Sequence, residues 1–187
     1  MFISIFQSIA VNKDSDSKAY VDRLSGEIFK VISNKNISLD QQKKIILQNF
    51  IDEIDFEWHG RAASGRLFRE MTDEQKVSFI KNYKDFLIRI WMPKFKGYNG
   101  EKYTVDPAEK INEKDSIVRI KITTQNSSII NLELKIRNYG DHFKILNITA
   151  EGIDMAKSYN SQFQSYADKY GINELINYVK TGVQKAQ

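Results

Sequence analysis

The chain has 187 residues, a length that suits one domain or a domain with a small subdomain. Hydrophobic residues make up 41% of it and charged residues 28%, which is typical of a soluble globular protein and excludes a disordered tail. Cysteine is absent, so disulfides, thiolate zinc sites and cysteine nucleophiles are excluded, and the net charge of +4 is a mild basic excess that identifies no acidic partner.

The first ten residues form a short apolar stretch that ends in Ser8, Ile9 and Ala10, and a polar segment follows it. Two interpretations stay open: the tail of a secretory signal whose basic start is missing, or a first amphipathic helix docked on the body. We therefore treat residues 1–15 as a signal-peptide remnant or an N-terminal extension, and residues 16–187 as a single domain. No run of about 18 apolar residues occurs, so we expect no segment to cross a bilayer.

Helices are predicted for the first half of the chain. Apolar residues recur at three- and four-residue steps over residues 17–32, which indicates an amphipathic helix. Ser38 and Gln41 form a capping box, in which side chains satisfy the free N–H groups of a second helix, and that helix is expected to continue to about Phe56. A less regular stretch follows, with a short helix expected around residues 64–69.

The longest predicted helix runs from Asp73 to about Met92. Thr72 and Gln75 form a second capping box at its start, and Pro93 stops it. Large apolar side chains cover more than one narrow stripe of this helix, so it must be covered on two sides. It is packed either between layers of protein, or against the core on one side and an apolar ligand on the other.

In the second half of the chain, apolar residues recur at every second position. This alternation predicts antiparallel strands with one polar and one apolar face. The expected strands cover residues 101–110, 118–123, 130–137 and 143–150. Pro107 interrupts the first of them, which suits an edge strand or a bulge. Residues 126–128 make a plausible turn between the second and third strands.

Two helices are expected at the end of the chain. Gly152 breaks the last strand, Asp154 can cap a helix that runs to Tyr170, and a final helix follows Gly171. The predicted fold class is therefore α+β, with a short curved antiparallel sheet covered by several helices. Such an arrangement, with many large apolar side chains, predicts an apolar cavity between sheet and helices.

The sequence contains few residues that could form a catalytic or metal-binding site. His59 and His142 are the two histidines, and neither has the spacing of a metal site or a nucleophile–base pair. Ser64 lacks the strand–elbow–helix context of a hydrolase serine. Basic and aromatic residues between Trp91 and Tyr103 could contact nucleic acid, but a helix end and a polar strand produce the same pattern. We expect no enzyme, no cofactor and no nucleic-acid partner.

Two ordered stretches carry a resemblance to a known family. In the C-terminal third, these are Phe143-Lys144-Ile145, then Ala150-Glu151-Gly152-Ile153-Asp154-Met155, Tyr159, Gln162-Phe163 and Gly171-Ile172-Asn173-Glu174-Leu175-Ile176. Earlier come Gly65-Arg66-Leu67-Phe68-Arg69, Thr72-Asp73-Glu74-Gln75, Phe79 and Phe86-Leu87. In this order they resemble the MlaC-like periplasmic phospholipid-binding proteins (the toluene-tolerance family) over roughly Tyr20 to Lys180. The chain departs from the family pattern at Phe68, Phe143, Asn147 and Asp154.

The resemblance implies a carrier in the periplasm, an auxiliary component of an ABC transporter. Its implied partners are an outer-membrane lipoprotein–porin complex and an inner-membrane ABC transporter complex with its substrate-binding ring. It would shuttle phospholipid between them and so maintain outer-membrane lipid asymmetry, with phospholipid as cargo and no catalytic residue. Because exposing acyl chains to water costs about 0.8 kcal/mol per methylene, such a carrier must surround the chains with protein.

The expected walls of the cavity are the longest helix, the apolar face of the sheet and the aromatic side of the helix that ends at Tyr170. The candidate lipid-binding residues are Phe79, Tyr83, Leu87, Val118, Ile120, Leu132, Leu134, Ile148, Met155, Tyr159 and Phe163. For each of them, ordinary core packing is the alternative, because alternation predicts a face and not a cavity. A second hypothesis for the whole chain is an NTF2-like module that binds a protein or a small apolar ligand without transferring lipid.

Overall fold

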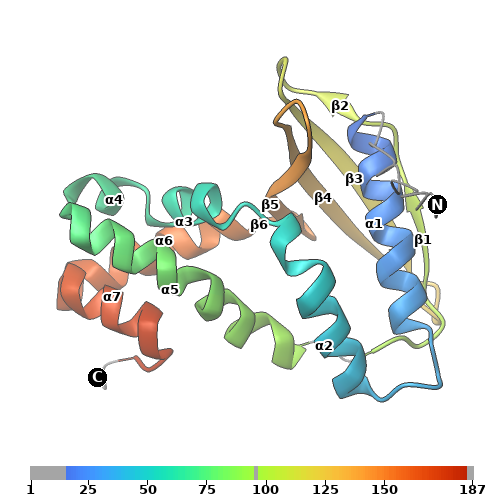
Figure 1. Cartoon of the computed structure of the whole chain (residues 1–187), viewed down its shortest axis with the longest axis horizontal. Coiled ribbons are helices and arrows are strands. Elements are labelled where there is room, and N and C mark those ends of the chain that lie inside the picture. The colour runs from blue at the N-terminus through green and yellow to red at the C-terminus, as the bar shows by residue number, and fades with distance from the viewer. Residues whose placement is uncertain (1–15, 95–96, 185–187) are drawn as a thin grey trace, which may run out of the picture.

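The computed structural model describes residues 16–94 and 97–184 (Figure 1). Both interpretations of the N-terminal segment therefore lie outside the described residues. The helices are α1 (Ser17–Ile32), α2 (Leu39–Asn49), α3 (Phe56–Ser64), α4 (Arg66–Glu70), α5 (Asp73–Trp91), α6 (Met155–Tyr170) and α7 (Ile172–Thr181), with 3₁₀ turns η1 (Ile51–Glu53) and η2 (Met92–Lys94). The strands are β1 (Lys102–Val105), β2 (Glu109–Lys110), β3 (Asp115–Thr123), β4 (Ile129–Asn138), β5 (Phe143–Ala150) and β6 (Ile153–Asp154). The predicted α+β class is confirmed.

The sheet is antiparallel and has the order β1-β3-β4-β5-β6, with β2 also paired to β3. Pro107 separates β1 from β2, so the interrupted edge strand of the prediction is confirmed. Ser127 has a φ of 63° in the turn between β3 and β4, where the prediction placed a turn. The very short β6 was not predicted, and it pairs back onto β5.

Both predicted capping boxes are present, at Ser38 for α2 and at Thr72 for α5. The second helix ends at Asn49, however, and not near Phe56 as predicted. Asp55 explains the difference, because its carboxylate accepts a hydrogen bond from the Trp58 N–H and so begins a new helix, α3.

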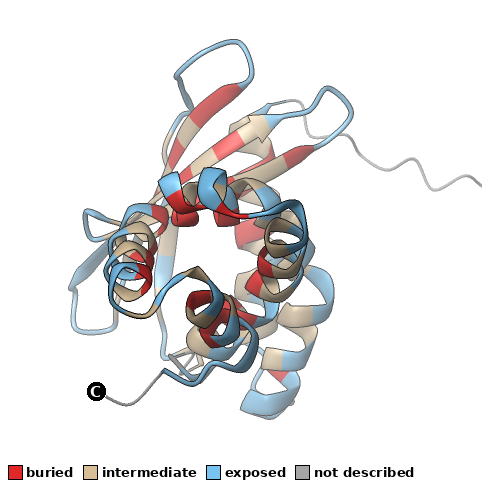
Figure 2. Cartoon of the chain, turned by 90° about the vertical axis from the view of Figure 1, so that its left-hand side faces the viewer, coloured by how far each residue is buried: buried red, intermediate tan, exposed pale blue. Residues whose placement is uncertain are grey.

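The helices α3 to α7 form a layer of their own beside the sheet, here called the helical layer (Figure 1). Its buried apolar residues form one cluster, the helical core: Ala63, Leu67, Met71, Phe79, Tyr83, Phe86, Leu87, Tyr159, Phe163, Ala167, Leu175, Tyr178 and Val179. Figure 2 looks onto this layer and shows the buried segments of its helices turned toward one another.

A second cluster, the sheet core, lies between α1 and the sheet. It consists of Tyr20, Val21, Leu24, Val118, Ile120, Leu134, Ile136 and Phe143. Strand β5 joins the two bodies, since it contacts both α3 and α6, and the Ala156 N–H donates to Oδ1 of Asn147 at 3.2 Å. Within the described ranges, no helix has the length and apolar character needed to cross a membrane.

Candidate functional site

The strand register defines an apolar face of the sheet, on which α1 packs. Paired residues of antiparallel strands lie on the same face. Two adjacent rows run across it: Val118, Leu134 and Ile148 in one, and Ile120, Leu132, Ala150 and Ile153 in the other. Both rows consist of apolar side chains alone, so this face stays apolar from the centre of the sheet to the β6 edge.

Burial on this face decreases in two directions. Along β4, the exposed fraction rises from 0% at Ile136 through 8% at Leu134 to 38% at Ile130. Across the strands, it rises from 7% at Ile120 to 60% at Ile153, with Leu132 half-buried between them. The protein therefore covers one end of its apolar face fully and leaves the opposite corner exposed.

Helix α2 packs beside α1 and is itself only partly buried. Its one buried residue is Gln42, and its apolar residues Ile45, Ile46 and Leu47 are half-buried. The Gln42 amide donates to the Ile32 carbonyl at 3.1 Å and the Asn34 carbonyl at 3.2 Å, which fastens α2 to the end of α1. In Figure 1, α2 stands between α1 and the helical layer. These two bonds from Gln42 therefore contribute to holding this half-buried helix in place.

A buried polar cluster lies in the helical layer, and sequence reasoning did not find it. His59 is 1% exposed, and its Nδ1 lies 2.8 Å from the Tyr83 hydroxyl. Burial lowers the pKa of His59 to about 4 and raises the pKa of Tyr83 above its ordinary value. The Nε2 atom of His59 has no hydrogen-bond partner among the described residues. The imidazole is therefore neutral at physiological pH and pairs with a tyrosine hydroxyl inside the helical layer.

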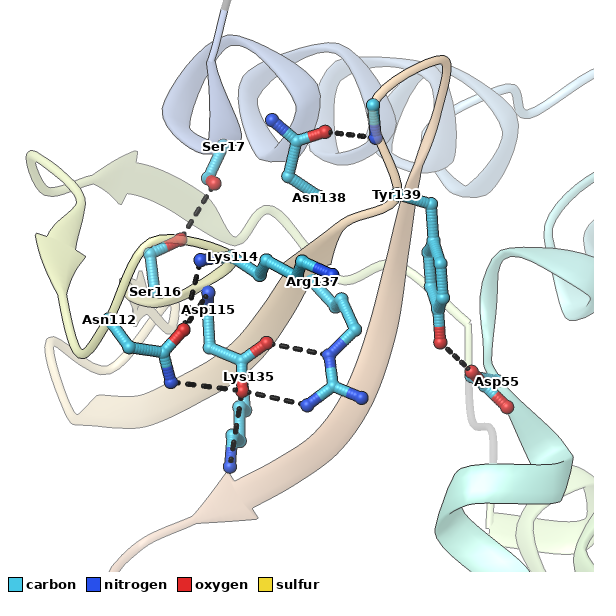
Figure 3. Close-up of polar contacts among 11 residues, drawn as sticks. Ser17, Asp55, Asn112, Lys114, Asp115, Ser116, Lys135, Arg137, Asn138 and Tyr139 are labelled. Carbon is cyan, nitrogen blue, oxygen red and sulfur yellow. Dashed lines mark hydrogen bonds and ion pairs between the residues drawn. The ribbon is translucent and has the colours of Figure 1, made fainter.

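A second polar cluster fixes the covered end of the sheet (Figure 3). The buried carboxylate of Asp115 on β3 accepts two hydrogen bonds from Arg137 on β4, at 2.7 and 2.9 Å, and these lower the pKa of Asp115. Asn112 accepts the Asp115 N–H at 2.8 Å and so shapes the preceding turn. From the next turn, the Tyr139 hydroxyl donates to Asp55 at the start of α3, at 2.5 Å. These contacts join β3 to β4 and connect the turn after β4 to the helical layer.

The family of the chain follows from comparison with known proteins. A family model described as "MlaC protein" matches residues 22–181. The chain belongs to the MlaC family. The resemblance predicted from the sequence is thereby confirmed.

Two known proteins are similar to this MlaC-family chain. The toluene tolerance protein ttg2D of Pseudomonas putida is 29% identical over 103 residues, which cover 55% of this chain and 48% of that protein, so the match spans about half of the relative's length. A phospholipid-binding protein of Ralstonia solanacearum, solved in complex with a phospholipid, superposes with a TM-score of 0.75. It is 19% identical, and the superposition covers 88% of this chain and 95% of that one. The superposition on the Ralstonia protein shows that the two chains share a fold.

In this MlaC-family fold, the candidate lipid-binding residues fall into both cores. Phe79, Tyr83, Leu87, Tyr159 and Phe163 belong to the helical core, whereas Val118, Ile120 and Leu134 belong to the sheet core. Leu132 and Ile148 are half-buried against the sheet core, and Met155 is half-buried at the start of α6. The structure thus brings the candidates together in two groups, and their contact with lipid stays a prediction.

The helical candidates contact one another closely. The ring of Phe79 stacks on Tyr83 with 5.5 Å between centroids and meets Phe163 edge-on at 5.8 Å. Helices α3 and α7 both pack on α5, so protein covers the buried side of the longest helix. Exposed Val77 shows that another side of it faces solvent. Among the candidates, the half-buried sheet residues are therefore the ones that a ligand can reach with the least rearrangement.

Two surface depressions on the described part of the chain lie away from these candidates. One of about 480 Å³ lies beside the start of α1 and the turn between β2 and β3, and one of about 500 Å³ lies between α6 and α7. Charged, amide and hydroxyl side chains line much of both, and neither includes a candidate lipid-binding residue. Their chemistry differs from the apolar face that an MlaC-like carrier is expected to use.

Proposed function

We propose that this protein carries phospholipid, with the acyl chains against the half-covered apolar face of the sheet, beside α2. The single observation that carries the proposal is the gradient of burial on that face, from Ile136 to Ile130 and from Ile120 to Ile153. Phe50, the residue after α2, packs against the sheet core and forms one boundary of the region. Leu132 and Ile148 form its floor.

The energetics favour a hydrocarbon ligand at this place. Covering a partly exposed apolar face lowers the free energy by about 25 cal/mol per Å² of apolar surface removed from water. An acyl chain gains in the same contact, at about 0.8 kcal/mol per methylene buried. The polar head group can stay in water, where it loses no hydrogen bonds. The proposed function requires no catalytic residue and no cofactor.

Membership of the MlaC family and a shared fold with a protein solved with phospholipid support this choice of cargo. On the same basis we place the carrier in the periplasm. Its proposed partners are the outer-membrane lipoprotein–porin complex and the inner-membrane ABC transporter complex with its substrate-binding ring. In this proposal the protein is a transport component that maintains outer-membrane lipid asymmetry.

The direct test is extraction of the purified protein with organic solvent, followed by mass spectrometry. Protein exported through a signal peptide is expected to release phospholipid in stoichiometric amount, because the apolar face would otherwise contact water. Recovery of no phospholipid from such protein would contradict the proposal and favour a module that binds a protein or a small apolar ligand.

A matched set of variants tests the location. Leu132→Glu and Ile148→Glu place a carboxylate on the apolar face, and we expect each to lower the bound phospholipid to about a tenth or less, because an ionised group does not enter hydrocarbon. Ile129→Glu is the control, since Ile129 is exposed and precedes Ile130 on β4, so it points to the opposite face. Equal lipid content in all three variants would place the acyl chains elsewhere.

A further inference from the structure

The exposed corner of the apolar face lies at a tight turn. Glu151 and Gly152 have φ values of 50° and 76° and form the two-residue turn between β5 and β6, which pairs Ala150 with Ile153. We call Ile130, Leu132, Ala150 and Ile153 the apolar corner. Two of these side chains, Ile130 and Ile153, are among the large hydrophobic groups that the described residues leave exposed.

The apolar corner is held in place by the neighbouring strand. The Glu151 N–H donates to the Asn131 carbonyl at 2.9 Å, and the Glu151 carboxylate accepts the Asn131 N–H in return. This reciprocal pair ties the turn to β4. The exposed isoleucines therefore sit on ordered backbone, and their exposure is a property of the fold.

We propose that the apolar corner contacts the surface of a lipid bilayer and is the route by which acyl chains pass between that bilayer and the protein. The inference rests on the proposed phospholipid cargo. Its structural basis is continuity: the row Ile120, Leu132, Ala150 and Ile153 leads without a polar residue from the sheet core to the edge of the molecule. An acyl chain that moves along it stays in apolar contact throughout.

The chemistry of the rim favours a bilayer over a protein surface. The exposed members are isoleucines, which enter hydrocarbon readily, while protein interfaces are anchored mainly by Trp, Tyr and Arg. The surface of two exposed isoleucines is also smaller than the roughly 800 Å² that each partner of a stable protein complex buries. Charged residues of both signs lie close to Ile153 in the sequence, namely Glu151, Asp154 and Lys157, so the contact is not expected to depend on anionic lipid.

The experiment measures delivery of a fluorescent phospholipid from the loaded full-length protein to phosphatidylcholine vesicles. Ile130→Glu and Ile153→Glu alter the corner. Ile111→Glu, at the opposite end of the sheet, and Val77→Glu, on α5, are matched controls, because they also replace an exposed aliphatic residue by a carboxylate. We expect the corner variants to deliver lipid about tenfold more slowly, while the controls and Ile153→Leu deliver at the wild-type rate.

Each outcome decides for or against the proposal. Corner variants that deliver lipid as fast as the controls would overturn it and would favour a receiving protein as the partner. A rate that falls steeply with added salt, or that requires anionic vesicles, would also overturn it, because an apolar contact is not screened. Extraction of each variant gives its bound phospholipid, so that delivery is expressed per molecule of bound lipid. A slower rate per bound lipid supports the corner, whereas wild-type protein without bound lipid contradicts the proposed cargo itself.

Discussion

At the scale of single residues, His59 shows how burial changes the chemistry of a side chain. The sequence identified it as a histidine without metal-binding or catalytic neighbours, and nothing local could predict Tyr83, which lies 24 positions further along the chain, as its partner. The contact depends on the packing of α3 against α5, which is a tertiary event. The fully buried ring stays neutral because a protonated imidazole at this position would lack the hydration that it has in water.

This burial predicts a dependence of stability on pH. The pKa of His59 falls from 6.5 to about 4 on folding, so between these values the unfolded chain binds a proton that the folded chain does not. Stability is therefore expected to decrease as the pH falls from about 6.5 to 4, by on the order of 3 kcal/mol in total. Urea unfolding at several pH values measures this slope. His59→Phe should flatten it, whereas the control His142→Phe removes an exposed histidine and should not.

At the scale of elements, caps were predictable where a capping box marks them. The capping boxes of α2 and α5 each join residues three apart, and both were found. Asp55 caps α3 through Trp58, also three residues on, but it was missed because the apolar period of the preceding helix continues through Ile54 and hides the break between the two helices. The register of β3 and β4 likewise depends on Asp115 and Arg137, a pair that alternation alone does not reveal.

The Asp115–Arg137 pair should stabilise the sheet more than an exposed pair of the same type. Asp115→Asn leaves the partly buried Arg137 without its carboxylate, and we expect a loss of about 2 kcal/mol in the free energy of unfolding. Asp168→Asn is the control, because Asp168 pairs with Arg66 at 2.6 Å but both side chains are largely exposed, and its loss should stay below about 1 kcal/mol. Equal losses in the two variants would show that burial is not the deciding factor.

The same pair has a defined pH signature. Because the pKa of Asp115 is lowered in the folded protein, its contribution is complete above the ordinary pKa of an aspartate and is lost as the pH falls through the folded value. Wild-type protein should therefore lose more stability than Asp115→Asn on acidification below about pH 4. Urea unfolding of both at pH 5 and pH 3 gives the comparison, and parallel losses would contradict it.

At the scale of the whole molecule, the order of helices and strands was predictable, because the change of apolar period from helical spacing to alternation marks it in the sequence. The division into two cores was not. Alternation placed Val118 and Leu132 on one face, but it could not show that α1 buries the first and leaves the second half-covered. The candidates on α5 and α6 are apolar for the same reason as any core residue, and their contacts within the helical layer appear only in three dimensions.

This division predicts where bound lipid stabilises the protein. If acyl chains occupy the half-covered face, removing them should lower the unfolding temperature, because a ligand at a hundredfold excess over its Kd contributes about 2.7 kcal/mol, or roughly 5–10 °C for a chain of this size. Hydrogen exchange should speed up in α2 and at the Ile130 and Ile153 ends of β4 and β6. The helical core around Phe79 and Phe86, packed ring against ring, should lose much less protection. Faster exchange confined to the helical layer would place the acyl chains among the helices, and an unfolding temperature unchanged by delipidation would contradict binding to the sheet face.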